Sequence, residues 1–212
     1  MVHYGSLRNS EFSSTSLPRL RLSDSTHHAL LLATHTPILS LLIVAAESWL
    51  FARKVTSSET WALAKEELRI WVNSEAAAKA TWHAIQLLRH VFSNSKEQGE
   101  NHTGMGLHEQ WCLYLAALVC WAYGFPSEAV QRRGPFTLDS QQPETLMWEY
   151  LNMADAQNWR GMLAMRGIGS TRGVLEYVRA RMQGGARMGK LVCEGEDVLR
   201  RLVEGRSRLS CF

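Results

Sequence analysis

The chain has 212 residues, of which 46% are hydrophobic and 20% are charged, and its formal net charge is +3. A chain of this length and composition can bury a sizeable core as one large domain or two small ones. The four cysteines form no C-x-x-C pair and no disulfide framework, which favours a reducing compartment over secretion. The first twenty residues lack the apolar core of a secretory signal, and the apolar stretch from Trp111 to Ser127 is too short for a membrane-spanning helix. These features exclude a disulfide-stapled scaffold and a membrane-spanning protein.

The charge is uneven along the chain. Residues 160–212 carry 11 Lys or Arg against 5 Asp or Glu, a net of +6 for the C-terminal quarter. A basic patch of this kind can meet nucleic acid or an acidic partner. The interpretation we favour is that these charges lie on the solvated faces of two amphipathic helices.

The predicted helices follow a polar lead-in over residues 1–22. Ser and Asp side chains around Asp24 offer N-cap oxygens, so the first helix is expected to start there. Pro37 suits the first turn of a second helix. The apolar residues after it recur at helical spacing and predict a nearly all-apolar helix over 37–53, which must lie deep in a core.

Two more helix starts follow. Thr56 and Glu59 form a capping-box pair ahead of a third helix. Its charged residues are expected to face water, and its apolar face is expected to carry Trp61, Leu63, Ala64, Leu68 and Trp71. Another helix is expected from Ser74, and residues 93–106 form a polar, turn-rich loop.

The most apolar predicted helix spans 107–123, with Gly124 and Pro126 as its stop signals. After a connector over 131–143, further helices are expected over 144–158, 173–183 and 190–204. No strand-like alternation of useful length appears. The sequence therefore predicts an all-α fold of about seven or eight helices, with the helical domain over 23–206 and a tail over 207–212.

Eight histidines and four cysteines invite a metal hypothesis. His27 and His28 with His35, or His83 with His90, could share a helix face. A zinc site usually joins two tight ligand pairs, because four ligands must converge on one ion, and no such double pair is present. We therefore predict no metal site and treat these histidines as capping, hydrogen-bonding or half-buried residues.

No residue pattern supports catalysis. Cys112 and Cys120 lie near one face of an apolar helix, where cysteine commonly acts as a small hydrophobe. No catalytic or nucleotide-binding motif occurs, and residues 165–170 contain only a G-x-G. Carboxylate-rich stretches are expected on solvated helix faces, at Glu66 and Glu67 and at Glu194, Glu196 and Asp197. The sequence thus predicts no catalytic, cofactor-binding or metal-binding residue and no enzyme.

Four segments together resemble a known family, the fungal-specific transcription factor domain in the version attached to two-cysteine two-histidine zinc fingers. The most specific runs are Trp82-His83-Ala84 with Leu87-Leu88-Arg89, and the run Leu118–Gly124. The four segments span residues 27–51, 68–92, 110–125 and 190–206. The resemblance covers about residues 22–206 and rests on packing patterns of Trp, Leu and Ala rather than on a chemical signature.

The resemblance implies the helical regulatory region of a nuclear protein that controls RNA polymerase II genes. It also implies that the chain is an incomplete copy of a larger helical domain. Zinc and DNA contact are then expected only through an N-terminal finger module that this sequence lacks. We expect a protein partner or self-association and no membrane contact, while a small-molecule effector is compatible with this interpretation.

Three other functions stay open at this stage. The chain could be a finger-less partner or inhibitor of a related regulator. It could be a helical small-ligand sensor or enzyme with an aromatic pocket, although these side chains are more simply core residues: Trp111, Tyr114, Trp121 and Tyr123. It could also bind DNA directly through its basic end, including Arg179, Arg181 and Arg187.

Overall fold

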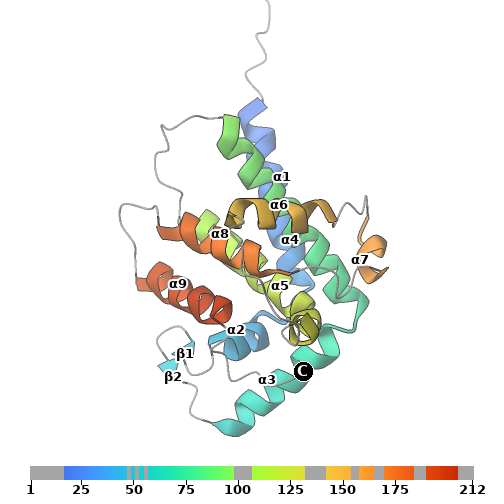
Figure 1. Ribbon diagram of the computed structural model, residues 1–212, viewed down its shortest axis with the longest axis vertical. Coiled ribbons are helices and arrows are strands. Elements are labelled where there is room, and N and C mark those ends of the chain that lie inside the picture. Colours follow the sequence, from blue (N-terminus) through green and yellow to red (C-terminus); the bar gives the residue numbers. More distant parts are fainter. Residues whose placement is uncertain are drawn as a thin grey trace, which may run out of the picture.

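The computed structural model describes residues 17–46, 49–50, 53–54, 57–97, 107–131, 142–153, 158–164, 170–183 and 190–204 (Figure 1). Within these ranges the chain forms nine helices, and a single two-stranded ladder of four residues is its only sheet. The prediction of an all-α fold is confirmed. The elements in chain order are α1 (Leu17–Thr34), α2 (Ile38–Ala46), β1 (Trp49–Leu50), β2 (Arg53–Lys54), α3 (Ser58–Trp71), α4 (Glu75–Glu97), α5 (Leu107–Gln131), α6 (Pro143–Met153), α7 (Arg160–Ala164), α8 (Arg172–Gln183) and α9 (Lys190–Val203).

The α5 helix is the centre of the core. Every residue from Leu113 to Tyr123 is buried, so the helix is enclosed on all sides over three turns. The α4 and α8 helices pack against it most extensively, and α2 and α9 also contact it (Figure 1). A helix that is apolar all round is stable only in such an enclosed position. The predicted core helix is therefore confirmed.

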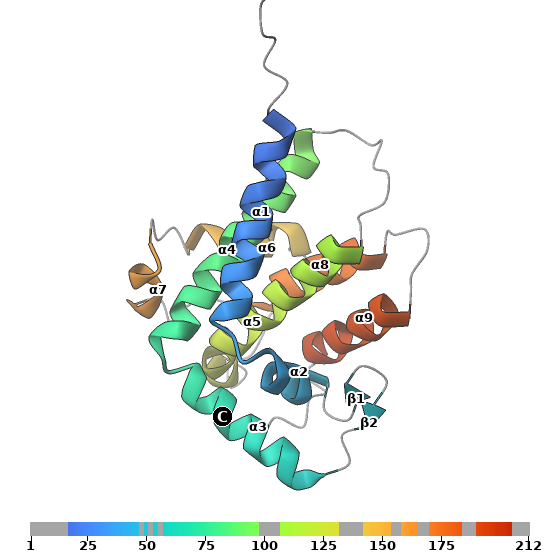
Figure 2. The same ribbon diagram turned by 180° about the vertical axis from the view of Figure 1, so that it is seen from behind.

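The α4 helix starts where the sequence predicts. The Ser74 hydroxyl accepts a hydrogen bond from the backbone N–H of Ala77 at 3.3 Å, as an N-cap does. Four fully buried alanines, which let neighbouring helices approach closely, lie along its first three turns: Ala77, Ala78, Ala80 and Ala84. The α4 helix packs between α5 and α1, which crosses it on the other side of the molecule (Figure 2).

The α3 helix differs from its prediction at one end and on one face. Its N-cap is Ser57 rather than Thr56, because the Ser57 hydroxyl accepts from the backbone N–H of Thr60 at 3.3 Å. Ala64, Leu68 and Trp71 are buried as expected. Leu63, which was assigned to the same apolar face, is instead exposed. The α3 helix is therefore amphipathic, but its outward side also carries apolar residues.

The chain leaves α2 earlier than predicted. The predicted helix over 37–53 ends at Ala46, and β1 then pairs with β2 in antiparallel register, Trp49 opposite Lys54 and Leu50 opposite Arg53. A ladder of two residues per strand is too short to leave an alternating pattern in the sequence.

The α5 helix continues where a stop was predicted. It runs through Gly124 and Pro126 to Gln131. Gly124 is a contact residue rather than a C-cap, because a Cβ there would lie 2.6 Å from Cγ2 of Thr171. The glycine lets α5 approach the chain just before α8. Gly173 has the same role between α8 and α6, since its Cβ would meet Leu146 at 2.5 Å.

The remaining predictions have mixed outcomes. The α1 helix begins at Leu17, earlier than the predicted start near Asp24, and residues 1–16 lie outside the described residues. The predicted helix over 144–158 ends at Met153, and the short α7 was not predicted. The helices α8 and α9 match their predictions within a residue. The α4 helix reaches Glu97, inside the predicted 93–106 loop. Two predicted segments lie wholly or mostly outside the described residues, the tail over 207–212 and the connector over 131–143.

No single helix in the described ranges has the length and apolarity needed to cross a membrane. By length and composition, one bent pair passes, residues 25–34 together with 38–45, which meet at 85°.

Candidate functional site

Five histidines from two helices come together where α1 lies on α4. The α1 helix carries His27 and His28, and His35 follows its last residue. The α4 helix carries His83 and His90, which are seven residues, or about two turns, apart and so share a face. In the sequence these residues form two separate groups, and the fold brings the two groups together.

The rings contact one another closely. A hydrogen bond of 2.9 Å joins the Nδ1 atoms of His28 and His83. The His90 ring stacks on His28 with centroids 5.6 Å apart, and the His35 ring stacks on His83 at 6.3 Å. The Trp82 indole contacts both His28 and His83 edge-on. The cluster is therefore a packed, partly aromatic contact between the two helices.

The hydrogen bond between His28 and His83 requires one donor and one acceptor. If both rings carried two protons, two N–H groups would face each other across 2.9 Å. Burial, together with the neighbouring charges of His28, His35 and His27, lowers the pKa of His83 to about 4. Near neutral pH His83 is thus uncharged. Protonation of both rings in acid would oppose the contact between α1 and α4.

The cluster does not form a metal centre in this arrangement. Among the described residues, no three His, Cys, Asp or Glu side chains are placed so that they could hold a metal ion. A structural zinc ion needs about four ligands converging on it. The histidine cluster consequently supports packing between α1 and α4.

The two cysteines of α5 are unreactive by environment. Cys120 is fully buried, which raises the pKa of its thiol to about 12. Burial, and then the charge of Glu109, also raises the pKa of the Cys112 thiol. The thiolate is the nucleophilic form, so neither residue is activated.

The aromatic residues proposed as a pocket lining fill the core instead. Tyr114, Trp121 and Tyr123 are buried, and Trp111 is half-buried with its ring 5.3 Å from that of Tyr114. The Tyr123 hydroxyl donates to the carbonyl of Met162 at 2.8 Å. Their contacts hold α5 against its neighbours and give no support to a ligand-binding role.

The carboxylate-rich stretches and the basic end form ion pairs on helix surfaces. Glu66 pairs with Arg69, whose hydrogen bond lowers the pKa of that carboxyl. In the C-terminal quarter three basic residues lie next to carboxylates, as the pairs Arg172–Glu176, Lys190–Glu194 and Arg200–Asp197. Arg179 and Arg181 are half-buried on α8, while Arg187 lies outside the described residues. These three pairs lie on helix surfaces, as expected for solvated helix faces.

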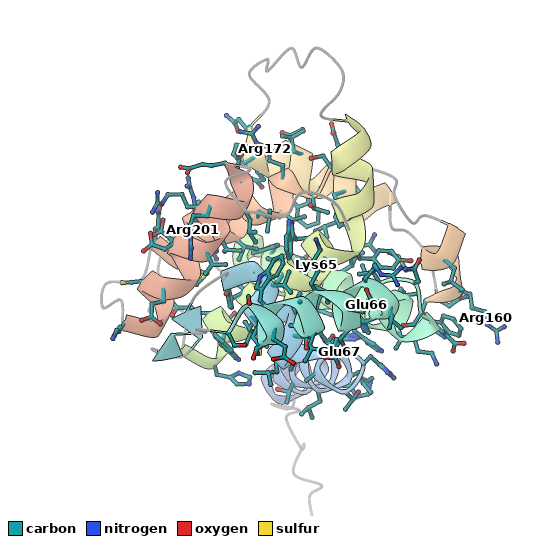
Figure 3. The ribbon with its side chains drawn as sticks, turned by 90° about the horizontal axis from the view of Figure 1, so that it is seen from below. Lys65, Glu66, Glu67, Arg160, Arg172 and Arg201 are labelled. Atoms are coloured by element: carbon teal, nitrogen blue, oxygen red, sulfur yellow. The ribbon has the colours of Figure 1, made fainter. Side chains whose placement is uncertain are left out.

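One surface carries exposed apolar residues beside carboxylates. We call it the outer face of α3 and define it as Glu59, Leu63, Glu66, Glu67 and Ile70. All five side chains are exposed, Leu63 at 66% and Ile70 at 61%. Figure 3 shows Glu66 and Glu67 projecting from α3 on the lower side of the molecule. This face was not predicted, because Leu63 was placed with the buried residues, although the helical step groups Leu63 with Glu59 and Ile70.

The comparisons with known proteins find two relatives. Over 112 residues, 52% of this chain, the sequence is 28% identical to zinc finger protein klf1 of Schizosaccharomyces pombe. Over 58 residues, 27% of the chain, it is 33% identical to zinc finger protein zas1 of the same yeast. This chain is distantly related to fission yeast zinc-finger proteins.

The matches cover a small part of each relative. They span only 13% of klf1 and 6% of zas1. No family model and no solved structure matches the chain. Neither relative has the name of an enzyme.

Proposed function

We propose that this chain is a helical regulatory region of a zinc-finger regulator of RNA polymerase II genes, and that it acts in the nucleus by contacting another protein. The single observation that carries the proposal is the similarity of about half the chain to zinc finger protein klf1. The resemblance of its Trp- and Leu-rich segments to the fungal-specific transcription factor domain supports the same function.

The chemistry of the described residues favours protein contact over the alternatives. On α5, Cys120 is buried and Cys112 is half-buried, the aromatic rings pack in or against the core, and three basic residues of the last two helices lie in ion pairs. What the surface offers instead is a set of exposed Leu and Ile side chains, on α1, α2, α3 and α7. Exposed apolar groups next to charged ones are common at sites where one protein docks on another. Zinc and direct DNA recognition would then belong to another part of the protein or to a partner.

A tethering experiment tests this function. The full chain is fused to an unrelated sequence-specific DNA-binding domain, and transcription is measured from a promoter that carries its site. The expected result is a severalfold rise or fall relative to the DNA-binding domain alone, because a regulatory region brings its partner to the promoter. Equal transcription from the two proteins at equal abundance would refute the proposal.

A matched control tests whether the change in transcription needs the folded helical region or only the presence of a fused chain. The same fusion is made with Trp121→Ala, which removes a fully buried core side chain while leaving every exposed residue in the sequence. If the change in transcription needs the folded helical region, this fusion behaves as the DNA-binding domain alone. An unchanged effect would assign the activity to an unfolded stretch and contradict a role for the helical fold.

A further inference from the structure

The outer face of α3 has a definite pattern. With a step of about 100° per residue, its five members fall within an arc of about 100°, and Leu63 and Ile70 lie near the middle. The residues that hold α3 to the core, Ala64 and Leu68, lie on the other side. A partner can therefore cover the outer face without disturbing the packing beneath it.

The cations of α3 do not occupy the middle of this face. The Lys65 ammonium lies over the Trp61 ring, 5.4 Å from its centroid. The Arg69 guanidinium forms two hydrogen bonds with Glu66, at 2.6 and 2.7 Å, from the flank of the helix. Three carboxylates thus border the two apolar side chains, with a single basic group at the edge.

The neighbouring helix α2 contacts one edge of the outer face of α3. The Ser40 hydroxyl donates a hydrogen bond to Glu67, which ties the first turn of α2 to α3. Leu39, next to this bond in the chain, is 61% exposed. The contact also fixes the Glu67 carboxylate, so part of the acidic border is pre-ordered before any partner arrives.

We propose that the outer face of α3 docks a basic amphipathic helix of another protein, with apolar residues over Leu63 and Ile70 and Lys or Arg beside the three carboxylates. This inference rests on the proposed function and adds the chemistry of the partner. An apolar stripe at helical spacing packs along such a face, and complementary charge fixes its register and speeds its approach.

Charge also argues against a second copy as the occupant. In a symmetric antiparallel pair centred between Leu63 and Ile70, Glu66 of one chain would lie opposite Glu67 of the other. Like charges at such a contact disfavour the pair. A basic partner meets the same carboxylates with opposite charge.

The test uses a defined probe and the full chain. A fluorescent 18-residue peptide, with Leu at helical spacing and Lys elsewhere, is titrated with the protein and followed by anisotropy. A control peptide carries Glu in place of Lys. We expect saturable binding of the Lys peptide that weakens as salt rises from about 20 to about 200 mM, and no binding of the Glu peptide.

Paired variants locate the site. Replacing both apolar residues by Leu63→Ser and Ile70→Ser is expected to weaken binding of the Lys peptide by about tenfold or more. The matched control replaces two exposed leucines elsewhere, Leu30→Ser on α1 and Leu163→Ser on α7, and is expected to bind as the wild-type chain does. Equal losses in both double variants, or no loss in either, would overturn the proposal.

A second pair of variants tests the charges. The first triple variant is expected to weaken binding by about tenfold and to flatten its salt dependence. It combines Glu59→Gln, Glu66→Gln and Glu67→Gln. The control changes three exposed carboxylates on other helices: Glu75→Gln, Glu109→Gln and Glu149→Gln. An identical salt dependence in the two triple variants would contradict a basic partner on this face.

Two further outcomes are decisive. If the chain sediments as a dimer that Leu63→Ser and Ile70→Ser dissociate, the occupant is a second copy and the proposal is wrong. If the Lys peptide fails to bind while the tethered chain still changes transcription, the partner chemistry is wrong but the proposed function stands. If the Lys peptide binds but the tethered chain leaves transcription unchanged, the partner chemistry stands and the proposed function is wrong.

Discussion

The helices α5 and α3 divide structural and interactive roles between them. The α5 helix holds two cysteines, two tryptophans and two tyrosines, and most of these side chains are buried among other helices. The α3 helix uses only Ala64, Leu68 and Trp71 for the core and turns Leu63, Ile70 and three carboxylates outward. The residues with the most distinctive chemistry therefore stabilise the fold, while the surface able to meet a partner is made of ordinary Leu, Ile and Glu. Changes in α5 should act on folding and changes on the outer face of α3 on binding.

The largest expected effect is on the α5 side of this comparison. Trp121→Ala should lower the free energy of unfolding by about 3 to 5 kcal/mol, because it leaves a cavity at a fully buried position. Urea unfolding followed by circular dichroism measures the loss. Trp111→Ala, at a half-buried position of the same helix, is the control and should cost clearly less. Equal losses for the two tryptophans would mean that burial along α5 does not set the stability.

A smaller effect is expected at the histidine cluster, where acid should weaken folding. The pKa of His83 is lowered to about 4, so the unfolded chain binds its proton near pH 6.5 and the folded chain resists until about pH 4. The contribution of His83 to the free energy of unfolding is therefore fully present above the unfolded pKa, and it is lost as the pH falls from about 6.5 to 4. We expect a loss on the order of 2 kcal/mol, after allowing for partial exposure.

Urea unfolding at pH 7 and pH 4.5 measures this loss. His83→Phe keeps an aromatic ring against Trp82 but removes the titrating group, so its pH dependence should be shallower. His108→Gln, on an exposed part of α5, is the control and should follow the wild-type profile. A profile for His83→Phe that matches the wild type would show that the cluster does not sense acid through His83.

The smallest expected effect on folding belongs to the outer face of α3. Leu63→Ser with Ile70→Ser should change the free energy of unfolding by less than about 0.5 kcal/mol per site, because both side chains are already exposed. The same variant should lose the Lys peptide. Thermal or urea unfolding beside the anisotropy titration gives both numbers. A large loss of stability would mean that these residues serve the core, and the contrast with α5 would fail.

The sequence predicts the elements whose local signals agree and misses those that depend on distant contacts. Ser74 and the alanines after it define α4, and the apolar run of α5 predicts burial without any knowledge of the neighbours. The end of α5 was wrong because Gly124 serves the contact with Thr171, on a segment 47 residues away. The predicted position of Leu63 was wrong for a local reason. A helix turns about 100° per residue, which already places Leu63 on a different side of α3 from Ala64 and Leu68.

The histidine cluster shows what a single helix pattern can and cannot reveal. His83 and His90 are seven residues apart and share one face of α4, and His28 and His35 have the same spacing, with His35 just after the end of α1. Nothing in the sequence states that these two faces meet, because the bond between His28 and His83 spans 55 residues. The matched spacing was the available signal for a shared contact. The partner of α3 is not encoded in the chain at all, so only its complementary chemistry can be inferred.

The most direct test of the whole account is the tethered transcription measurement made on three chains side by side: wild type, Leu63→Ser with Ile70→Ser, and Leu30→Ser with Leu163→Ser. We expect wild type and the α1–α7 variant to change transcription alike, while the α3 variant, at equal abundance and stability, returns it to the level of the DNA-binding domain alone. If all three chains change transcription equally, the outer face of α3 is not the regulatory contact. If none does, the chain is not a regulatory region.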